Sequence, residues 1–302
     1  DGHMNRVVRH AIARGLAPMA AIQMASLNTA LHFGLERELG SITPGRRADL
    51  VLTSDLPSLP IELVIARGEV VAEVGRLTVA IPPAVYPAAV RDTVRIGRRL
   101  SASDFDIAAP PGANSVEARV IGIIENQAPT RALQRTLAVR DGLVAMDRAA
   151  DICQIAVVER HRGTGALVNA FVSGFGYAVD CAVASSVAHD AHNIIVVGTD
   201  TSDMAQAVNR LGDIGGGIVV VSKGRELALI ELPIAGLMSD ERAEIVAVKA
   251  DRMIEAMRQC GCRLNNAYMQ HSLLALVVIP ALRISDQGLV DVTRFAKTEL
   301  FV

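Results

Sequence analysis

The sequence predicts a mixed fold that combines the α/β and α+β classes and contains more than one domain. Its 302 residues are enough for two domains or for one large domain with an appendage. Hydrophobic residues make up 51% of the chain and aromatic residues only 3%, so the apolar mass consists of Ala, Val, Ile and Leu. Runs rich in β-branched residues and amphipathic helical patterns occur along the same chain, which indicates that strands and helices pack together.

The first forty residues predict three short helices. An apolar helical stripe begins at Met4, and Gly15 is placed to end that helix. Pro18 suits the first turn of a second helix because its φ is fixed. Asn28 is expected to cap a third helix that ends at Gly34.

Strand patterns and a linker follow these helices. Residues 48–52 and 62–77 are rich in β-branched side chains, and Arg-Gly and Val-Gly pairs supply the turns. Because a sheet of two or three strands is marginal in water, these strands are expected to need partners that the chain does not obviously supply. Five prolines in the stretch 80–112 predict a linker into another domain.

The rest of the chain predicts a second domain in which strands alternate with turns and two helices. The helices are expected at about residues 202–212, capped by Ser202, and 240–259, with a Ser-Asp start at Ser239. Between them, a glycine bend precedes a hairpin with its turn at Ser222–Gly224. The strands are expected in the runs ARVIGII, LAVRDGLVAM, ICQIAVVER and CAVASSVA.

Composition and charge disfavour several classes of partner. The formal net charge is −2 and no run of Lys or Arg is interleaved with aromatic residues, so we expect neither nucleic acid nor an anionic membrane. The longest apolar run, residues 273–282, is too short to span a bilayer, so a soluble cytoplasmic protein is expected. The cysteines form no Cys-x-x-Cys pair and are expected to be buried, reduced thiols: Cys153, Cys181, Cys260 and Cys262.

Common nucleotide-binding and zinc motifs are absent from the sequence. The stretches GTGALV (163–168) and GFGYAV (174–179) lack the third glycine of a dinucleotide fingerprint, and no Gly-Lys pair is present for a P-loop. There is no His-x-His, no His-Glu-x-x-His and no Pro-Cys-x-x-Cys.

The stretch SSVAHDAHN (185–193) concentrates polar side chains between two strand-like runs. Asp190 and Asn193 are turn formers, and a bend there would gather them with His189 and His192 at the end of two buried strands, where pKa values shift. The simpler alternative is that Asp190 and Asn193 only cap the turn while one histidine donates to a backbone carbonyl. Two histidines alone are weak evidence for a metal site, because zinc or iron ordinarily takes three or more protein ligands.

Three further polar residues, Glu125, Arg160 and His161, follow two other expected strands. Taken singly, each is better interpreted as an exposed strand end or as part of an ion pair than as a functional residue.

Several stretches resemble the amidohydrolase superfamily and, within it, the bacterial-type adenine deaminases. Residues 21–52, AIQMASLNTALHFGLERELGSITPGRRADLVL, resemble the segment with which many amidohydrolases leave their (β/α)₈ barrel and enter a small β-sandwich. The more specific stretches resemble the C-terminal domain of adenine deaminases, and they are VVERHRGTG (157–165), ASSVAHDAHNIIVVGT (184–199), GGGIVVV (215–221) and LPIAGLMS (232–239).

The resemblance implies a division into three parts. Residues 1–40 would be the last helices of the barrel, residues 41–108 the sandwich strands and a linker, and residues 109–302 the C-terminal α+β domain. The family's His-x-His is absent, and its metal-binding Asp should precede Asp1. The resemblance therefore implies the C-terminal half of an enzyme, without activity of its own and expected to associate with the preceding N-terminal half.

The chemistry implied by the resemblance is hydrolytic deamination of adenine to hypoxanthine and ammonia. A binuclear divalent metal centre, manganese or iron with zinc as the alternative, would supply a hydroxide from ligands outside this segment. The loop at 185–193 is expected to cover the barrel mouth, with His189, Asp190 and His192 as the catalytic candidates. Ser186, Asn193 and Glu125 are the candidates for substrate binding, and a homo-oligomer is expected.

Two other functions stay open. Residues 113–302 could serve as a non-catalytic module for assembly or shielding, with an architectural histidine-rich loop. The chain could also belong to another amidohydrolase, such as a dihydroorotase or an imidazolone-cleaving enzyme, but that interpretation explains only residues 21–52.

Overall fold

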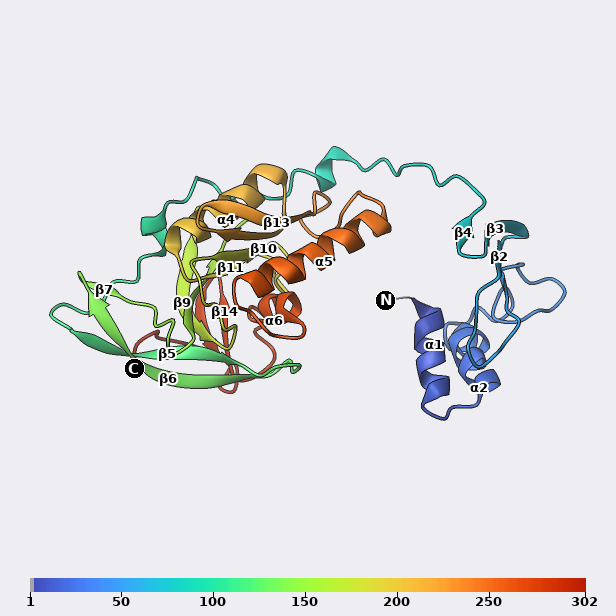
Figure 1. The fold of residues 1–302 in the computed structure, drawn as a ribbon, viewed down its shortest axis with the longest axis horizontal. Helices are drawn as coiled ribbons and strands as arrows, with labels where there is room; N and C mark the ends of the chain where they lie inside the picture. Colours follow the sequence, from blue (N-terminus) through green and yellow to red (C-terminus); the bar gives the residue numbers. More distant parts are fainter. Residues whose placement is uncertain (1–2) are drawn as a thin grey trace. The chain divides into compact units, whose positions relative to one another are not determined.

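The computed structural model describes residues 3–302, and the chain forms two compact units that divide after Pro83 (Figure 1). The N-terminal unit begins with α1 (Met4–Ala13), which ends before Gly15, at φ +101°, as expected. One continuous helical stretch then follows, built from α2 (Pro18–Gln23), the π-helical turn η1 (Met24–Asn28) and α3 (Thr29–His32). The prediction that Asn28 caps a separate helix was therefore wrong, since its φ of −65° and ψ of −38° continue the helix.

A small antiparallel sheet completes the N-terminal unit. Its strands, in spatial order, are β1 (Leu50–Leu52), β2 (Leu63–Ala66), β3 (Glu69–Glu73) and β4 (Arg76–Leu77). None of these strand residues is fully buried within this chain. Large apolar side chains are also exposed on the helices, namely Met4, Val7, Met19, Met24 and Leu31, and directly after α3 at Phe33.

The C-terminal unit is built on one nine-stranded sheet with the order β13-β12-β10-β11-β8-β9-β5-β6-β7. Neighbouring strands are antiparallel except β5 and β9, which are parallel. The strands are β5 (Ser115–Ile123), β6 (Thr130–Arg140), β7 (Leu143–Val144), β8 (Ile152–Val158), β9 (Leu167–Ser173), β10 (Ala182–Ser185), β11 (Ile194–Gly198), β12 (Gly217–Ser222) and β13 (Arg225–Glu231).

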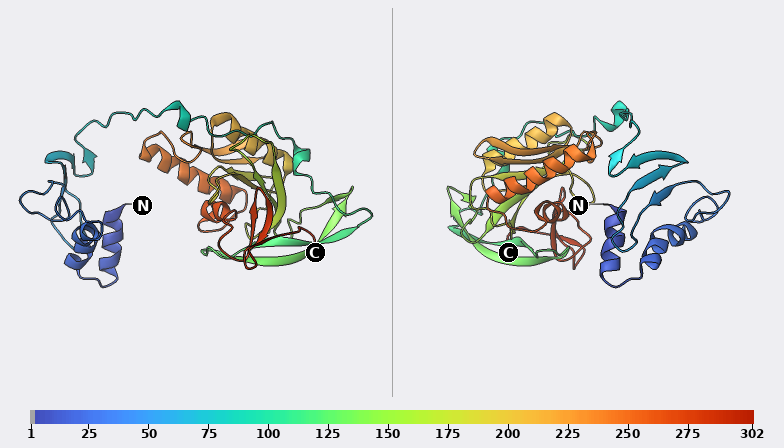
Figure 2. Two further views of the ribbon diagram at one scale, coloured as in Figure 1. Left: turned by 180° about the vertical axis from the view of Figure 1, so that it is seen from behind. Right: turned by 45° about the vertical axis from the view of Figure 1, so that its right-hand side comes forward.

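Both faces of this sheet are covered, which explains why every residue of β8, β10 and β11 is buried (Figure 2). Val196 of β11 shares one core with Val208 of α4 (Thr201–Ile214). Val197, the next residue, shares the opposite core with Met253 of α5 (Ala243–Gln259), because successive residues of a strand point to opposite faces. The same second core includes residues of α6 (Ala267–Leu273) and of a small sheet, β14 (Leu282–Ser285), β15 (Gly288–Asp291) and β16 (Ala296–Thr298).

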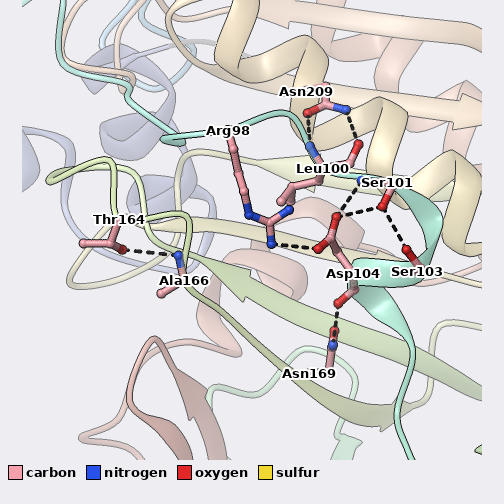
Figure 3. Close-up of polar contacts among 9 residues, drawn as sticks. All are labelled: Arg98, Leu100, Ser101, Ser103, Asp104, Thr164, Ala166, Asn169 and Asn209. Atoms are coloured by element: carbon pink, nitrogen blue, oxygen red, sulfur yellow. Dashed lines mark hydrogen bonds and ion pairs between the residues drawn. The ribbon is translucent and has the colours of Figure 1, made fainter.

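Part of the stretch predicted as a linker is an ordered cover over α4 and the sheet (Figure 3). The Asn209 side chain of α4 accepts a hydrogen bond from the Leu100 amide at 2.9 Å and donates one to the Leu100 carbonyl at 2.8 Å. Ser101 and Asp104 form a capping box at the short 3₁₀ helix η3 (Ala102–Phe105), while Asn169 of β9 donates to the Asp104 carbonyl at 3.1 Å. Short-range sequence patterns do not reveal such contacts, because Leu100 and Asn209 are far apart in the chain.

The helix starts in the second half differ from the predicted ones. Asp200, and not Ser202, caps α4 by accepting the Asp203 amide at 2.9 Å. The second long helix starts at Ala243, after the predicted Ser239. The predicted hairpin is present, with Lys223 and Gly224 at positive φ between β12 and β13. Within residues 3–302, no helix is long and apolar enough to cross a membrane.

Candidate functional site

The histidine-rich stretch forms the connection between two buried antiparallel strands, as predicted. Residues 186–193, here called the His loop, join β10 to β11, and Ser185 pairs with Ile195 where the loop closes. Ile194 also pairs with Val158, so the loop lies beside the residues that follow β8. The sheet therefore brings Arg160 and His161 to the same edge as the His loop.

The two histidines of the loop lie close together but have different surroundings. Their ring centroids are 5.3 Å apart with an interplanar angle of 56°. The His192 Nδ1 atom accepts a hydrogen bond from the Ala188 amide at 3.2 Å, so the neutral ring carries its proton on Nε2. Burial, followed by the nearby His189 and Arg160, lowers the pKa of His192, which favours this neutral form.

His189 holds the other side of the loop through its backbone. Its amide donates to the Ser272 carbonyl of α6 at 3.1 Å. Its Nδ1 atom is buried and has no hydrogen-bond partner among the described residues. Asp190, by contrast, is exposed to solvent. The His189 side chain therefore has an unused hydrogen-bonding position beside a neutral neighbouring imidazole.

Ser186 and Asn193 use their polar atoms inside the protein. The fully buried Ser186 hydroxyl donates to the Gly236 carbonyl at 2.6 Å and accepts the Gly217 amide at 2.8 Å. The Asn193 side-chain oxygen accepts the Arg160 amide at 3.2 Å. Both side chains thus tie the His loop to neighbouring segments, and their binding of substrate stays a prediction.

The structure separates Glu125 from the other candidates. Glu125 follows β5, whose end pairs with the end of β9, whereas the His loop lies at the opposite end of β8. The seven residues of β8 correspond to roughly 20 Å. Glu125 accepts the Asn265 amide at 3.0 Å and lines a separate cavity of about 520 Å³ together with Arg258 and Arg263.

Sequence reasoning missed Glu159, which builds the turn beside the His loop. Its carboxylate accepts the amides of His161 at 2.6 Å, Arg162 at 2.8 Å and Thr164 at 3.1 Å. Burial acts to raise the pKa of Glu159, but these amides and the Thr164 hydroxyl outweigh it and lower the pKa to about 2. His161 in this turn lies with its Nε2 atom 2.7 Å from the Ala191 carbonyl oxygen of the His loop. The alternation of glycines in RGTG is the only sequence signal of this turn.

The four stretches that carry the resemblance to adenine deaminases meet at this edge of the sheet. Residues 157–165 end β8, residues 184–199 contain the His loop, residues 215–221 begin β12, and residues 232–239 follow β13. Arg160 and Ser186 connect them through hydrogen bonds to backbone atoms. They are one three-dimensional feature, although long stretches of sequence separate them.

The described residues do not offer a metal centre. Among residues 3–302, no three His, Cys, Asp or Glu side chains are grouped so that they could hold a metal ion. The four cysteines are free and buried, as predicted.

Comparison with known proteins gives relatives along the whole chain. The chain is 69% identical to adenine deaminase 3 of Rhizobium meliloti over all of its length and 51% of that protein, and 68% identical to adenine deaminase of Mesorhizobium japonicum over all of its length and 50% of that protein. It is 46% identical to adenine deaminase of Moorella thermoacetica over 99% of its length and 50% of that protein. The chain thus spans about half the length of the curated relatives it matches.

Two family models match different parts of the chain. The amidohydrolase family matches residues 1–71, and the adenine deaminase C-terminal domain matches residues 127–296. The second match covers more than half of the chain and includes the His loop. The chain therefore belongs to the adenine deaminase C-terminal domain family.

Proposed function

We propose that this chain is the C-terminal half of an adenine deaminase, an enzyme that hydrolyses adenine to hypoxanthine and ammonia. The names of the relatives at 69% and 68% identity support this activity, and the amidohydrolase match over residues 1–71 supports a barrel end followed by sandwich strands. The exposed apolar side chains of the N-terminal unit and its sheet without buried residues fit helices and strands that need further partners. The missing barrel portion would supply them. A cytoplasmic location and a homo-oligomeric state remain predictions.

The metal centre of this enzyme is proposed to lie outside the chain. Membership of the amidohydrolases suggests a divalent metal ion, whereas the described residues contain no suitable group of ligands. We place the ligands in the N-terminal half and expect a binuclear centre of manganese or iron, with zinc as the alternative. This half alone is then expected to be inactive.

The His loop is proposed to contact adenine or the attacking water at the mouth of the barrel. The observation that carries this assignment is the buried Nδ1 atom of His189, which has no partner in the described chain and lies beside the neutral His192. Adenine is neutral and planar, with ring nitrogens that accept and an amino group that donates hydrogen bonds. A pair of imidazoles with both donor and acceptor atoms suits such a molecule. Asp190 extends the same group towards solvent.

Substitution of His189 in the full-length enzyme tests the assignment. His189→Ala is expected to lower kcat for adenine by about 100-fold or more, the range typical of a lost acid–base group, while Tm changes little because the ring has no internal hydrogen bond. Asp190→Asn should lower kcat as well. Asp286→Asn, in the turn between β14 and β15, is the matched control and should leave kcat unchanged. Unaltered kcat in His189→Ala and Asp190→Asn together would remove the His loop from the reaction.

A non-catalytic, shielding role of the C-terminal unit is the competing function. It is favoured by one observation, namely that Ser186, Asn193 and Arg160 use their hydrogen bonds within the domain. Under this alternative, the His189→Ala enzyme would keep its kcat and lose only stability or assembly. Size-exclusion chromatography of the same variant distinguishes the two outcomes.

A further inference from the structure

We infer that Arg160 is a positioning residue that holds the His loop in one conformation and places a positive charge next to His192. Arg160 is 1% exposed, yet no carboxylate lies within ion-pairing distance of it among the described residues. A buried guanidinium without a counter-ion is costly unless its donors are satisfied. The acceptors that satisfy it are all backbone carbonyl oxygens, and they show which segments it joins.

The Arg160 side chain connects three segments that are far apart in sequence. Its Nε atom donates to the His192 carbonyl of the His loop. One terminal nitrogen donates to the Ala235 carbonyl at 3.1 Å, and the other lies 3.4 Å from the Thr93 carbonyl. The planar fork of arginine can satisfy several acceptors at fixed angles, whereas the single ammonium of lysine cannot reproduce this geometry. The His loop is therefore anchored through the backbone of His192 itself.

The turn that follows β13 is shaped to the guanidinium. Gly236 has φ of +69°, and a Cβ atom there would lie 2.7 Å from a terminal nitrogen of Arg160. The same turn accepts the Ser186 hydroxyl at the Gly236 carbonyl. Arg160 and Ser186 thus hold the His loop against one turn from two sides.

The charge of Arg160 also acts on His192. The groups that face His192 are His189, Asp190, Arg160 and His161, of which only Asp190 favours a charged imidazole. Glu159 in the adjacent turn directs its carboxylate to the backbone amides of that turn. Removing the positive charge of Arg160 would therefore make protonation of His192 easier.

The effect of Arg160 on turnover rests on the proposed function, whereas its effect on the His loop does not. The experiment therefore measures histidine modification and enzyme kinetics separately. In the full-length enzyme, the rate at which diethyl pyrocarbonate modifies His189 and His192 is followed by mass spectrometry between pH 5 and pH 9. This reagent reacts with neutral imidazole, so the pH profile reports the protonation state of each histidine. The kcat and KM for adenine are measured over the same pH range.

Two substitutions separate position from charge. Arg160→Gln should shift the midpoint of the His192 modification profile to higher pH by about half a pH unit or more, because the positive charge is lost. It should also raise the plateau rate of modification, because the anchor of the His loop is lost. Arg160→Lys should raise the plateau rate but keep the midpoint, since the charge remains. Both should lower kcat about tenfold or more, with a smaller change in KM.

Asn209→Ala is the matched control, because it likewise removes hydrogen bonds to backbone atoms of a distant segment, here two to Leu100, and the Asn209 side chain forms no hydrogen bond to the His loop (Figure 3). It should lower Tm without changing either histidine profile. If the Arg160 variants behave like Asn209→Ala, the positioning role is refuted. Altered histidine profiles with unchanged kcat would confirm the positioning role and refute the catalytic role of the loop. If Arg160→Gln does not fold, the modification rate of His192 in Arg160→Lys tests the positioning role: a raised plateau rate supports it, and an unchanged plateau rate refutes it.

Discussion

His192 closes its own loop on Ala188, four residues earlier in the chain. The His192 Nδ1 atom accepts the Ala188 amide at 3.2 Å, and the His192 amide donates to the Ala188 carbonyl at 2.7 Å. The φ of His192 is +52°, a region that favours Gly and Asn over other residues. His192 therefore has a structural role in the loop in addition to its proposed chemical one, and the two can be separated.

Asparagine at position 192 is expected to keep the structural role alone. Its side-chain oxygen can replace the Nδ1 atom as the acceptor for Ala188, and Asn tolerates positive φ. His192→Asn should keep Tm within about 1–2 °C and lose most of kcat for adenine in the full-length enzyme. His192→Ala should lower both. Equal kcat in His192→Asn and the parent enzyme would show that the imidazole of His192 has only a structural role.

Ser186 should contribute to stability more than to catalysis. Ser186→Ala leaves the buried Gly217 amide without its 2.8 Å acceptor and the Gly236 carbonyl without its 2.6 Å donor. A buried unsatisfied group costs about 1–3 kcal/mol, so the free energy of unfolding should fall by this amount. Urea denaturation measures it. Ser202→Ala, at an exposed position of α4, is the control and should change stability by less than about 0.5 kcal/mol.

Local patterns predicted most strands of the large sheet, though not β9, and they predicted the His loop between two of these strands. The runs ICQIAVV and IIVVG are continuous and rich in β-branched residues, which is typical of strands buried on both faces. Asp190 and Asn193 mark the turn between such runs. A strand, a turn and a second strand fix the position of His189 and His192 at one edge of the sheet without any long-range information.

Residues whose partners are backbone atoms could not be predicted from these patterns. Glu159 binds amides of its own turn, and Arg160 binds carbonyls of segments as far away as Thr93 and Ala235. Neither contact requires a particular partner side chain, so the sequence carries no matching residue to find. Asn28 shows the converse error. Asparagine is a residue type that often caps helices, so the local pattern predicted a cap, but the helix continues through Asn28.

Gly236 is expected to tolerate no side chain. An alanine there would have an unfavourable φ of +69° and a Cβ atom 2.7 Å from Arg160, whose position is fixed by three carbonyls. Gly236→Ala should therefore lower the free energy of unfolding by about 2 kcal/mol or more. Gly224→Ala is a suitable comparison, since Gly224 has a similar φ of +72° but its nearest neighbour would be 3.9 Å away. Similar losses in both variants would mean that φ alone matters and that the contact with Arg160 does not.

Glu159 should make stability depend on pH in the acidic range. Its pKa is about 2 in the folded protein and 4.5 without the fold, so its carboxylate stabilises the fold above about pH 4.5 and this contribution disappears as the pH falls towards 2. Glu159→Gln should cost on the order of 2–3 kcal/mol at pH 7 and much less at pH 3. Thermal unfolding at both pH values measures the difference. A constant loss at both would show that the charge of Glu159 is unimportant.

His271 should destabilise the fold in a different pH range. It is buried on α6 beneath the His loop, its Nε2 atom donates to the Val183 carbonyl at 3.1 Å, and burial lowers its pKa from 6.5 to about 4. Between these values the unfolded chain binds a proton that the folded chain does not, so stability falls as the pH drops from about 6.5 to 4, by on the order of 3 kcal/mol in total.

The His271→Gln variant tests this pH dependence, because the glutamine amide can still donate to Val183 but does not titrate. Between pH 7 and pH 4.5, the free energy of unfolding should fall less in the variant than in the parent enzyme. His10→Gln, at an exposed position of α1, should retain the parent's pH dependence. If His271→Gln and the parent lose stability in parallel over this range, another group is responsible for the acid sensitivity.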